Sequence, residues 1–170
     1  MRMDTLVRVG GGAAILAGVL RATGSFASGR SEVERQSLYF IVDLLLLLGV
    51  FAVYAQNHEA MRLWGAAGFL TTVVGILVVR SSRVIPGLDL YPVGALSVAV
   101  GWVLLSFAWW KTANGSAFVP ALFVLSIVTG LVSQMVPRAA PLLIVSGVIF
   151  GTAMVGVGRE LLSRNPGVPK

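Results

Sequence analysis

The sequence predicts an all-α protein, namely an integral membrane bundle of six transmembrane helices. Of its 170 residues, 56% are hydrophobic and 12% are charged, and the mean hydropathy is +0.88. Soluble domains carry charges at about a quarter of their positions. The chain also contains six apolar segments, each near the ~20 residues that a helix needs to cross ~30 Å of hydrocarbon. Because lipid cannot satisfy backbone hydrogen bonds, such uninterrupted runs are expected to be helical.

The six predicted spans follow one another along most of the chain. They cover residues 9–27, 38–55, 63–79, 90–110, 117–136 and 139–158. Short polar stretches separate them, and we interpret these stretches as turns: GRSEVERQ, QNHEAMR, RSSRVIPGLD, KTANGS and VPRAAP. The sequence therefore predicts one transmembrane domain over residues 1–162, followed by a flexible tail over residues 163–170 that contains two prolines.

A weak internal repeat suggests that the bundle consists of three hairpins. The even-numbered spans begin with LYFIV at Leu38, LYPVG at Leu90 and LLIVS at Leu142, which are 52 residues apart in both cases. A period of this length suits a two-helix unit. The alternative is chance, because membrane spans draw on few residue types.

Small residues predict where helices approach closely. Lipid tails are as apolar as leucine, so the hydrophobic effect does not drive helices together in a bilayer. Helices there associate through close packing at small residues spaced four apart. The first span has Gly10, Ala14 and Gly18 in this spacing, and the last has Gly147 and Gly151. We expect these faces to pack within the chain, and a homodimer face is the alternative. Three tryptophans at one end of the fourth span are expected to be interfacial anchors: Trp102, Trp109 and Trp110.

One carboxylate, Asp43, lies inside the second span, where an unpaired charge costs several kcal/mol. Helix rise places Arg21 at the same membrane face, so we expect the two to form an ion pair, with Arg80 or Gln134 completing the hydrogen bonds of Asp43. The polar residues expected to gather there as a ligand-binding region are Arg21, Asp43, Arg80, Asp89, Tyr91 and Gln134. The alternative is that Arg21 and Asp43 only lock a hairpin.

Several classes of function are disfavoured by composition. The chain has no cysteine and one histidine, His58, which excludes thiolate metal sites and bis-histidine haem within one chain. No G-x-S-x-G, H-E-x-x-H or phosphate-binding loop motif occurs. The 13 basic residues are scattered between apolar runs, so nucleic acid is not an expected partner. We therefore predict no enzyme activity, no cofactor and no metal.

The segments RVGGGAAILAGVLRA and GVIFGTAMVGVGRELL resemble small, uncharacterised multi-span bacterial membrane proteins. This resemblance is in keeping with the expected location, the bacterial cytoplasmic (inner) membrane, and it carries over no activity and no functional residue. The six spans and the small residues of the first helix are also similar to six-span substrate-binding subunits of vitamin importers, although the loops are short for a substrate lid. An even number of spans places both termini on one side, where seven basic residues against six favour the cytoplasm.

The favoured function is a non-enzymatic, multi-pass accessory component. It would contact membrane lipid and bind another membrane protein, a second copy of itself, or an apolar or amphiphilic ligand. The alternative is an oligomeric or monomeric transporter of a small or lipid-like solute. Between Asp43 and the opposite surface, the sequence offers such a solute mainly the hydroxyls of Thr71, Thr72 and Ser97.

Overall fold

The computed structural model describes residues 3–26, 31–81, 90–112, 115–136 and 141–163. Within these ranges the chain forms five helices and no strand: α1 (Met3–Gly24), α2 (Glu32–Ser81), α3 (Tyr91–Lys111), α4 (Phe118–Met135) and α5 (Pro141–Ser163). All five are long and apolar enough to cross a membrane. The prediction of an all-α membrane protein is confirmed at this level. Asp89 and residues 164–170 of the expected tail lie outside the described residues.

Helix α2 covers both the second and the third predicted spans, because the intervening QNHEAMR stretch is helical instead of a turn. This stretch contains no glycine or proline, so little in it opposes a helix. Only Arg62 leaves helical geometry, with φ 49° and ψ −142°. A positive φ is rare for a residue with a side chain and costs on the order of 1–3 kcal/mol, so this strain is held by the surrounding packing.

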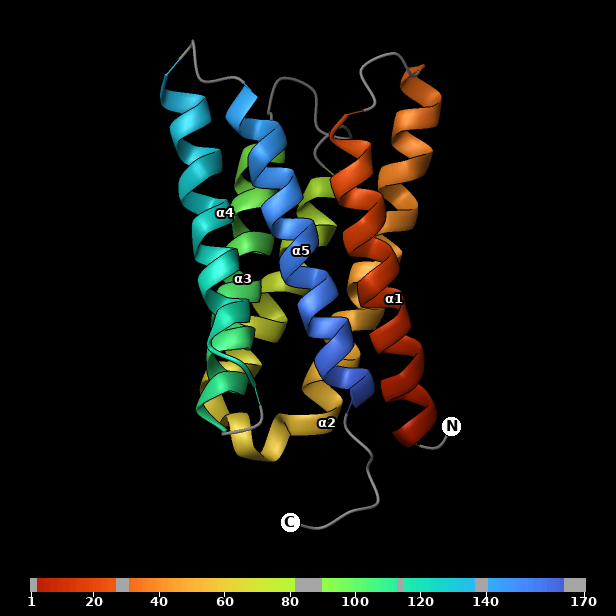
Figure 1. The fold of residues 1–170 in the computed structure, drawn as a ribbon, viewed down its shortest axis with the longest axis vertical. Coiled ribbons are helices and arrows are strands. Elements are labelled where there is room, and N and C mark those ends of the chain that lie inside the picture. Colours follow the sequence, from red (N-terminus) through yellow and green to blue (C-terminus); the bar gives the residue numbers. More distant parts are fainter. Residues whose placement is uncertain (1–2, 27–30, 82–89, 113–114, 137–140, 164–170) are drawn as a thin grey trace.

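The bend at Arg62 turns α2 back along itself (Figure 1). We call residues 32–61 the first arm and residues 63–81 the second arm. The ring of Phe69 on the second arm contacts two rings on the first, with centroids 5.1 Å from Phe51 and 4.6 Å from Tyr54. The two arms therefore lie side by side, and α2 is a hairpin with a helical turn region.

The remaining helices complete a bundle around this hairpin. Helix α1 packs against α2 and α5, α5 also packs against α4, and α3 contacts both α2 and α4. The start of α1, the end of α5 and the bend of α2 lie at one end of the bundle (Figure 1). The start of α2, the start of α3 and the start of α5 lie at the other end, which we call the upper end.

The five small residues predicted to pack helices all lie at contacts between helices or next to one. A side-chain carbon added to Gly10 would be 2.9 Å from the carbonyl oxygen of Leu48 in α2, and one added to Gly49 would be 3.3 Å from Cβ of Ala14. Gly18 and Gly151 face each other's backbone across α1 and α5, and Gly147 faces the hydroxyl of Ser25. These contacts lie within one chain.

The interior is filled by large side chains between α3, α4 and α5. The Trp102 ring stacks on Phe123 with centroids 5.4 Å apart, and Phe123 meets Phe150 at 5.3 Å. Trp102 and Trp109 are 0% and 1% exposed. The prediction that they are interfacial anchors is therefore wrong. They lie on the face of α3 that turns inward, where their rings fill the interior of the bundle.

Candidate functional site

The polar centre of the molecule is an ion pair between the two arms of α2. The Nε of Arg80, in the last turn of the second arm, donates a hydrogen bond of 2.6 Å to Oδ2 of Asp43 on the first arm, and its Nη2 contacts the same oxygen. The side chains of Arg80 and Asp43 are 33% and 19% exposed. Pairing lets both groups stay charged at a depth where either alone would be costly.

The sequence had suggested that Asp43 forms its ion pair with Arg21. The structure shows that its partner is Arg80 instead. Arg21 lies near enough to act electrostatically on Asp43, but its guanidinium carbon lies over the Tyr39 ring, 5.4 Å from the centroid. The bend at Arg62 returns the second arm alongside the first, which brings a residue 37 positions away into contact with the carboxylate. Depth in the membrane favoured Arg21, whereas the hairpin of α2 places Arg80 against Asp43.

Two aromatic rings flank the carboxylate one turn earlier in the first arm. Tyr39 and Phe40 precede Asp43 by four and three residues, so all three lie on one side of the helix. The guanidinium of Arg80 lies 5.4 Å from the centroid of Phe40, as that of Arg21 lies over Tyr39. Each arginine therefore covers one ring, in the arrangement of a cation–π contact.

A shallow, open hollow of about 400 Å³, which we call the upper hollow, lies beside the ion pair. Its walls come from the first arm and from the end of the second: Gln36, Ser37, Phe40, Ile41 and Arg80. Phe40 and Ile41 are about half exposed, so the hollow presents apolar surface below and polar groups above. Such mixed walls suit a molecule that has a polar head and an apolar body.

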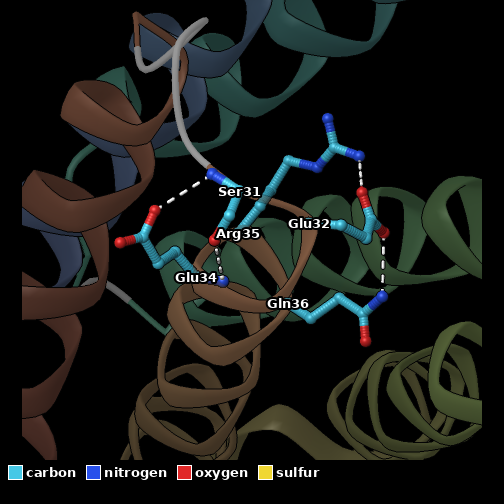
Figure 2. A network of polar contacts seen from close by, with 5 residues as sticks. All are labelled: Ser31, Glu32, Glu34, Arg35 and Gln36. Atoms are coloured by element: carbon cyan, nitrogen blue, oxygen red, sulfur yellow. Dashed lines mark hydrogen bonds and ion pairs between the residues drawn. The ribbon is translucent and has the colours of Figure 1, made fainter.

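A network of polar contacts holds the start of α2 (Figure 2), and one of its members, Gln36, also lines this hollow. The amide of Ser31 donates to Glu34 at 3.0 Å, and the amide of Glu34 donates to the hydroxyl of Ser31 at 3.3 Å, which makes a reciprocal capping box. The carboxylate of Glu32 accepts hydrogen bonds from Arg35 and, at 2.8 Å, from Nε2 of Gln36. Gln36 is thereby held between the exposed cap and the hollow.

The structure thus brings together three of the six residues predicted for the ligand-binding region, namely Arg21, Asp43 and Arg80. Tyr91 and Gln134 are exposed at the start of α3 and near the end of α4, and neither lines the hollow. Asp89 lies outside the described residues. Sequence reasoning missed five residues in the two turns before Asp43: Gln36, Ser37, Tyr39, Phe40 and Ile41. For Tyr39 and Phe40, the spacing of four and three residues from Asp43 was a usable signal.

A second hollow of about 360 Å³ lies between α4 and α5 at the opposite end of the bundle. Its polar residues include Thr152, Arg159 and Glu160. Both oxygens of Glu160 accept hydrogen bonds of 3.2 Å from the amide of Ser116, so this carboxylate secures the turn before α4. We interpret this hollow as part of the helix connection.

No metal-binding group of three or more histidine, cysteine, aspartate or glutamate side chains occurs in the part of the chain that the structure describes. The chemistry available at the upper hollow is therefore ionic and hydrogen-bonding recognition by Arg80, Gln36 and Ser37. Comparison of the chain with protein-family models, curated proteins and solved structures gave no match.

Proposed function

We propose that this protein is a non-enzymatic component of the bacterial cytoplasmic membrane that binds an amphiphilic molecule at the upper hollow. The observation that carries the proposal is a charged pair, Asp43–Arg80, whose guanidinium also lines a hollow with exposed apolar walls at Phe40 and Ile41. A guanidinium held in place by a carboxylate is oriented before any ligand arrives, which lowers the cost of ordering it on binding.

Solute transport is the alternative function. Two of the three hydroxyls that would line its polar path, those of Thr72 and Ser97, give it little support. Thr72 donates to the carbonyl of Gly68 at 2.8 Å, and Ser97 donates to that of Val93 at 2.8 Å. Both hydroxyls are engaged by their own helix, a common way for such groups to be satisfied in lipid. This arrangement supports a binding role over a conducting one.

The proposed topology is six crossings, with each arm of α2 crossing once. The apolar composition of both arms and the bend at Arg62 support it. The three contacts of α1 with α2, of α2 with α3 and of α4 with α5 also agree with three successive hairpins. With termini placed on the cytoplasmic side by the basic residues, the upper hollow opens at the outer face.

Cysteine labelling tests this topology directly, because the chain has no cysteine of its own. Ser31→Cys and Glu59→Cys place single exposed thiols at the start of the first arm and just before the bend. An impermeant maleimide should label the two variants from opposite sides of the membrane. Labelling of both from the same side would overturn the six-crossing topology.

Photo-cross-linking tests the binding function. The purified chain in mild detergent would be mixed with an amphiphile that carries a diazirine on the tail carbons next to its polar head, and the cross-linked residues would be located by mass spectrometry. We expect cross-links to concentrate at Phe40 and Ile41, and Ile41→Ala to reduce them more than Leu125→Ala. These two positions are matched in exposure, at 48% and 50%. Labelling spread evenly over the exposed apolar residues would reject the site.

A further inference from the structure

Two arginines lie near the single carboxylate of Asp43. Two guanidinium groups, those of Arg21 and Arg80, act on this one carboxylate. The neighbouring Arg35 is already joined to Glu32. The remaining carboxylate at the start of α2, that of Glu34, accepts a hydrogen bond from the amide of Ser31. The charge that lines the hollow is the guanidinium of Arg80, and the complement of a guanidinium is an anion.

Arg80 has unused capacity to bind an anion while it holds Asp43. A guanidinium carries five N–H donors in a planar fork, and its contacts to Asp43 run through Nε and Nη2 to one oxygen. The side chain is one-third exposed and lines the hollow. Gln36 and Ser37 stand on the same wall, and a hydroxyl beside a guanidinium is a suitable pair of donors for phosphate oxygens.

An exposed apolar stripe leads from this polar wall toward the middle of the first arm. Its members recur at helical spacing and are each about 40–50% exposed: Phe40, Leu44, Leu48 and Phe51. Eleven residues of helix rise correspond to about 16 Å, close to the ~15 Å depth of hydrocarbon in one leaflet. The stripe thus matches the length of an acyl chain that starts at the level of the ion pair.

We propose that the amphiphile at this site is an anionic membrane phospholipid. Its headgroup would lie at Arg80, Ser37 and Gln36, with Arg21 adding longer-range attraction, and one acyl chain would follow the stripe of the first arm. This inference rests on the proposed function and adds a class of ligand to it. The common chemistry is a phosphate group, and the apolar stripe favours a lipid over free phosphate as its source.

Native mass spectrometry of the full chain, released from detergent, can test this selectivity. The probes are phosphatidylglycerol and phosphatidylcholine with identical acyl chains, titrated separately. We expect phosphatidylglycerol to bind about tenfold more tightly, which corresponds to about 1.4 kcal/mol. Glycerol phosphate, added as a competitor at millimolar concentration, should displace little bound lipid, and full displacement would contradict a lipid as the occupant.

Arg21→Gln is the informative variant, because Arg21 makes no direct ion pair with Asp43 and its removal leaves the Asp43–Arg80 pair intact. We expect it to weaken phosphatidylglycerol binding about threefold to tenfold and to leave phosphatidylcholine unchanged. Arg21→Lys should restore most of the binding. Arg8→Gln is the matched control, since Arg8 is exposed on the same helix at the opposite end of the bundle, and it should have no effect on either lipid.

The outcomes separate the two proposals. Equal affinity for both lipids, with cross-links still at Ile41, would overturn anionic selectivity and keep the binding function. No cross-linking at the hollow and no lipid adduct of either kind would overturn the binding function itself. Equal losses in the Arg21→Gln and Arg8→Gln variants would reject the assigned headgroup position, because only general charge would then matter.

Discussion

The second arm of α2 contacts its two neighbours in different ways. Against α3 it packs backbone to backbone: a side-chain carbon added to Gly75 would be 2.6 Å from the amide nitrogen of Val98, and one added to Gly94 would be 2.7 Å from that of Val79. Against the first arm it uses long side chains, namely the Phe69 ring and the guanidinium of Arg80.

The contact of the second arm with α3 therefore has a structural role, whereas its contact with the first arm includes groups that can bind a ligand. The α2–α3 contact leaves no room for an added atom, so it fixes the position of the second arm. The contact between the arms consists of aromatic rings near the bend and of the partly exposed Arg80–Asp43 pair at the upper end. Of these groups, the charged pair has the polar atoms that can bind a ligand. We therefore expect substitutions at the two contacts to differ in kind as well as in size.

The largest effect is expected from breaking the ion pair at one end. Asp43→Leu strands the guanidinium of Arg80 and should lower the free energy of unfolding by about 3–5 kcal/mol. The double variant Asp43→Leu/Arg80→Leu should recover most of this loss, since no charge is then left alone. Equilibrium unfolding in mixed micelles would measure the full cycle, and additive losses would show that the pair is not coupled. The same cycle with Arg21→Leu should give a smaller coupling energy.

The next effect tests the backbone contact. Gly75→Ala places a methyl group against the α3 backbone and should cost about 1–3 kcal/mol through overpacking. Gly12→Ala is the control, because nothing lies within 4 Å of the added carbon; it should be neutral or stabilise the helix by up to about 1 kcal/mol. Unfolding in the same micelles measures both. If both variants had the same stability, the close α2–α3 contact would be contradicted.

A smaller loss is expected at the aromatic contact between the arms. Phe69→Leu keeps an apolar side chain but removes two ring contacts, each worth about 0.5–1.5 kcal/mol beyond buried area. Phe26→Leu is the control, because Phe26 is 66% exposed and should tolerate leucine. Thermal unfolding in detergent, followed by circular dichroism, would compare the two. A larger loss at Phe26 would contradict the ring cluster.

The smallest effect concerns a buried hydroxyl on the second arm. Thr72→Val removes the hydrogen bond to the carbonyl of Gly68 while keeping the shape of the side chain. Membrane hydrogen bonds of this type average about 0.6 kcal/mol, so the loss should stay below 1 kcal/mol. The same replacement at Thr152, which bonds the carbonyl of Val148 on an exposed face, is the control. A loss above that for Gly75→Ala would mean that the hydroxyl has a further role.

Part of the site could be predicted from the sequence, because one physical requirement applies to a charged residue inside a membrane span. A carboxylate among apolar residues needs a partner, which pointed to Asp43 and to a set that contained Arg80. The rings of Tyr39 and Phe40 were readable from their spacing, yet nothing in the sequence distinguished them from ordinary lipid-facing aromatics. Tyr91 and Gln134 were included because their spans end at the same face, and membrane depth alone does not specify direction around a helix.

The sequence by itself determined the solvent and the class of structure, because hydropathy and the need to satisfy backbone groups depend only on composition and segment length. It did not determine how each helix is rotated about its axis. That rotation follows from many close contacts, such as Gly75 against α3, which turn Arg80 toward Asp43 and bury Trp102 and Trp109. The tertiary structure alone decided that Arg62, and not the whole QNHEAMR stretch, makes the turn of α2, since only packing of the arms can hold its backbone in a strained conformation.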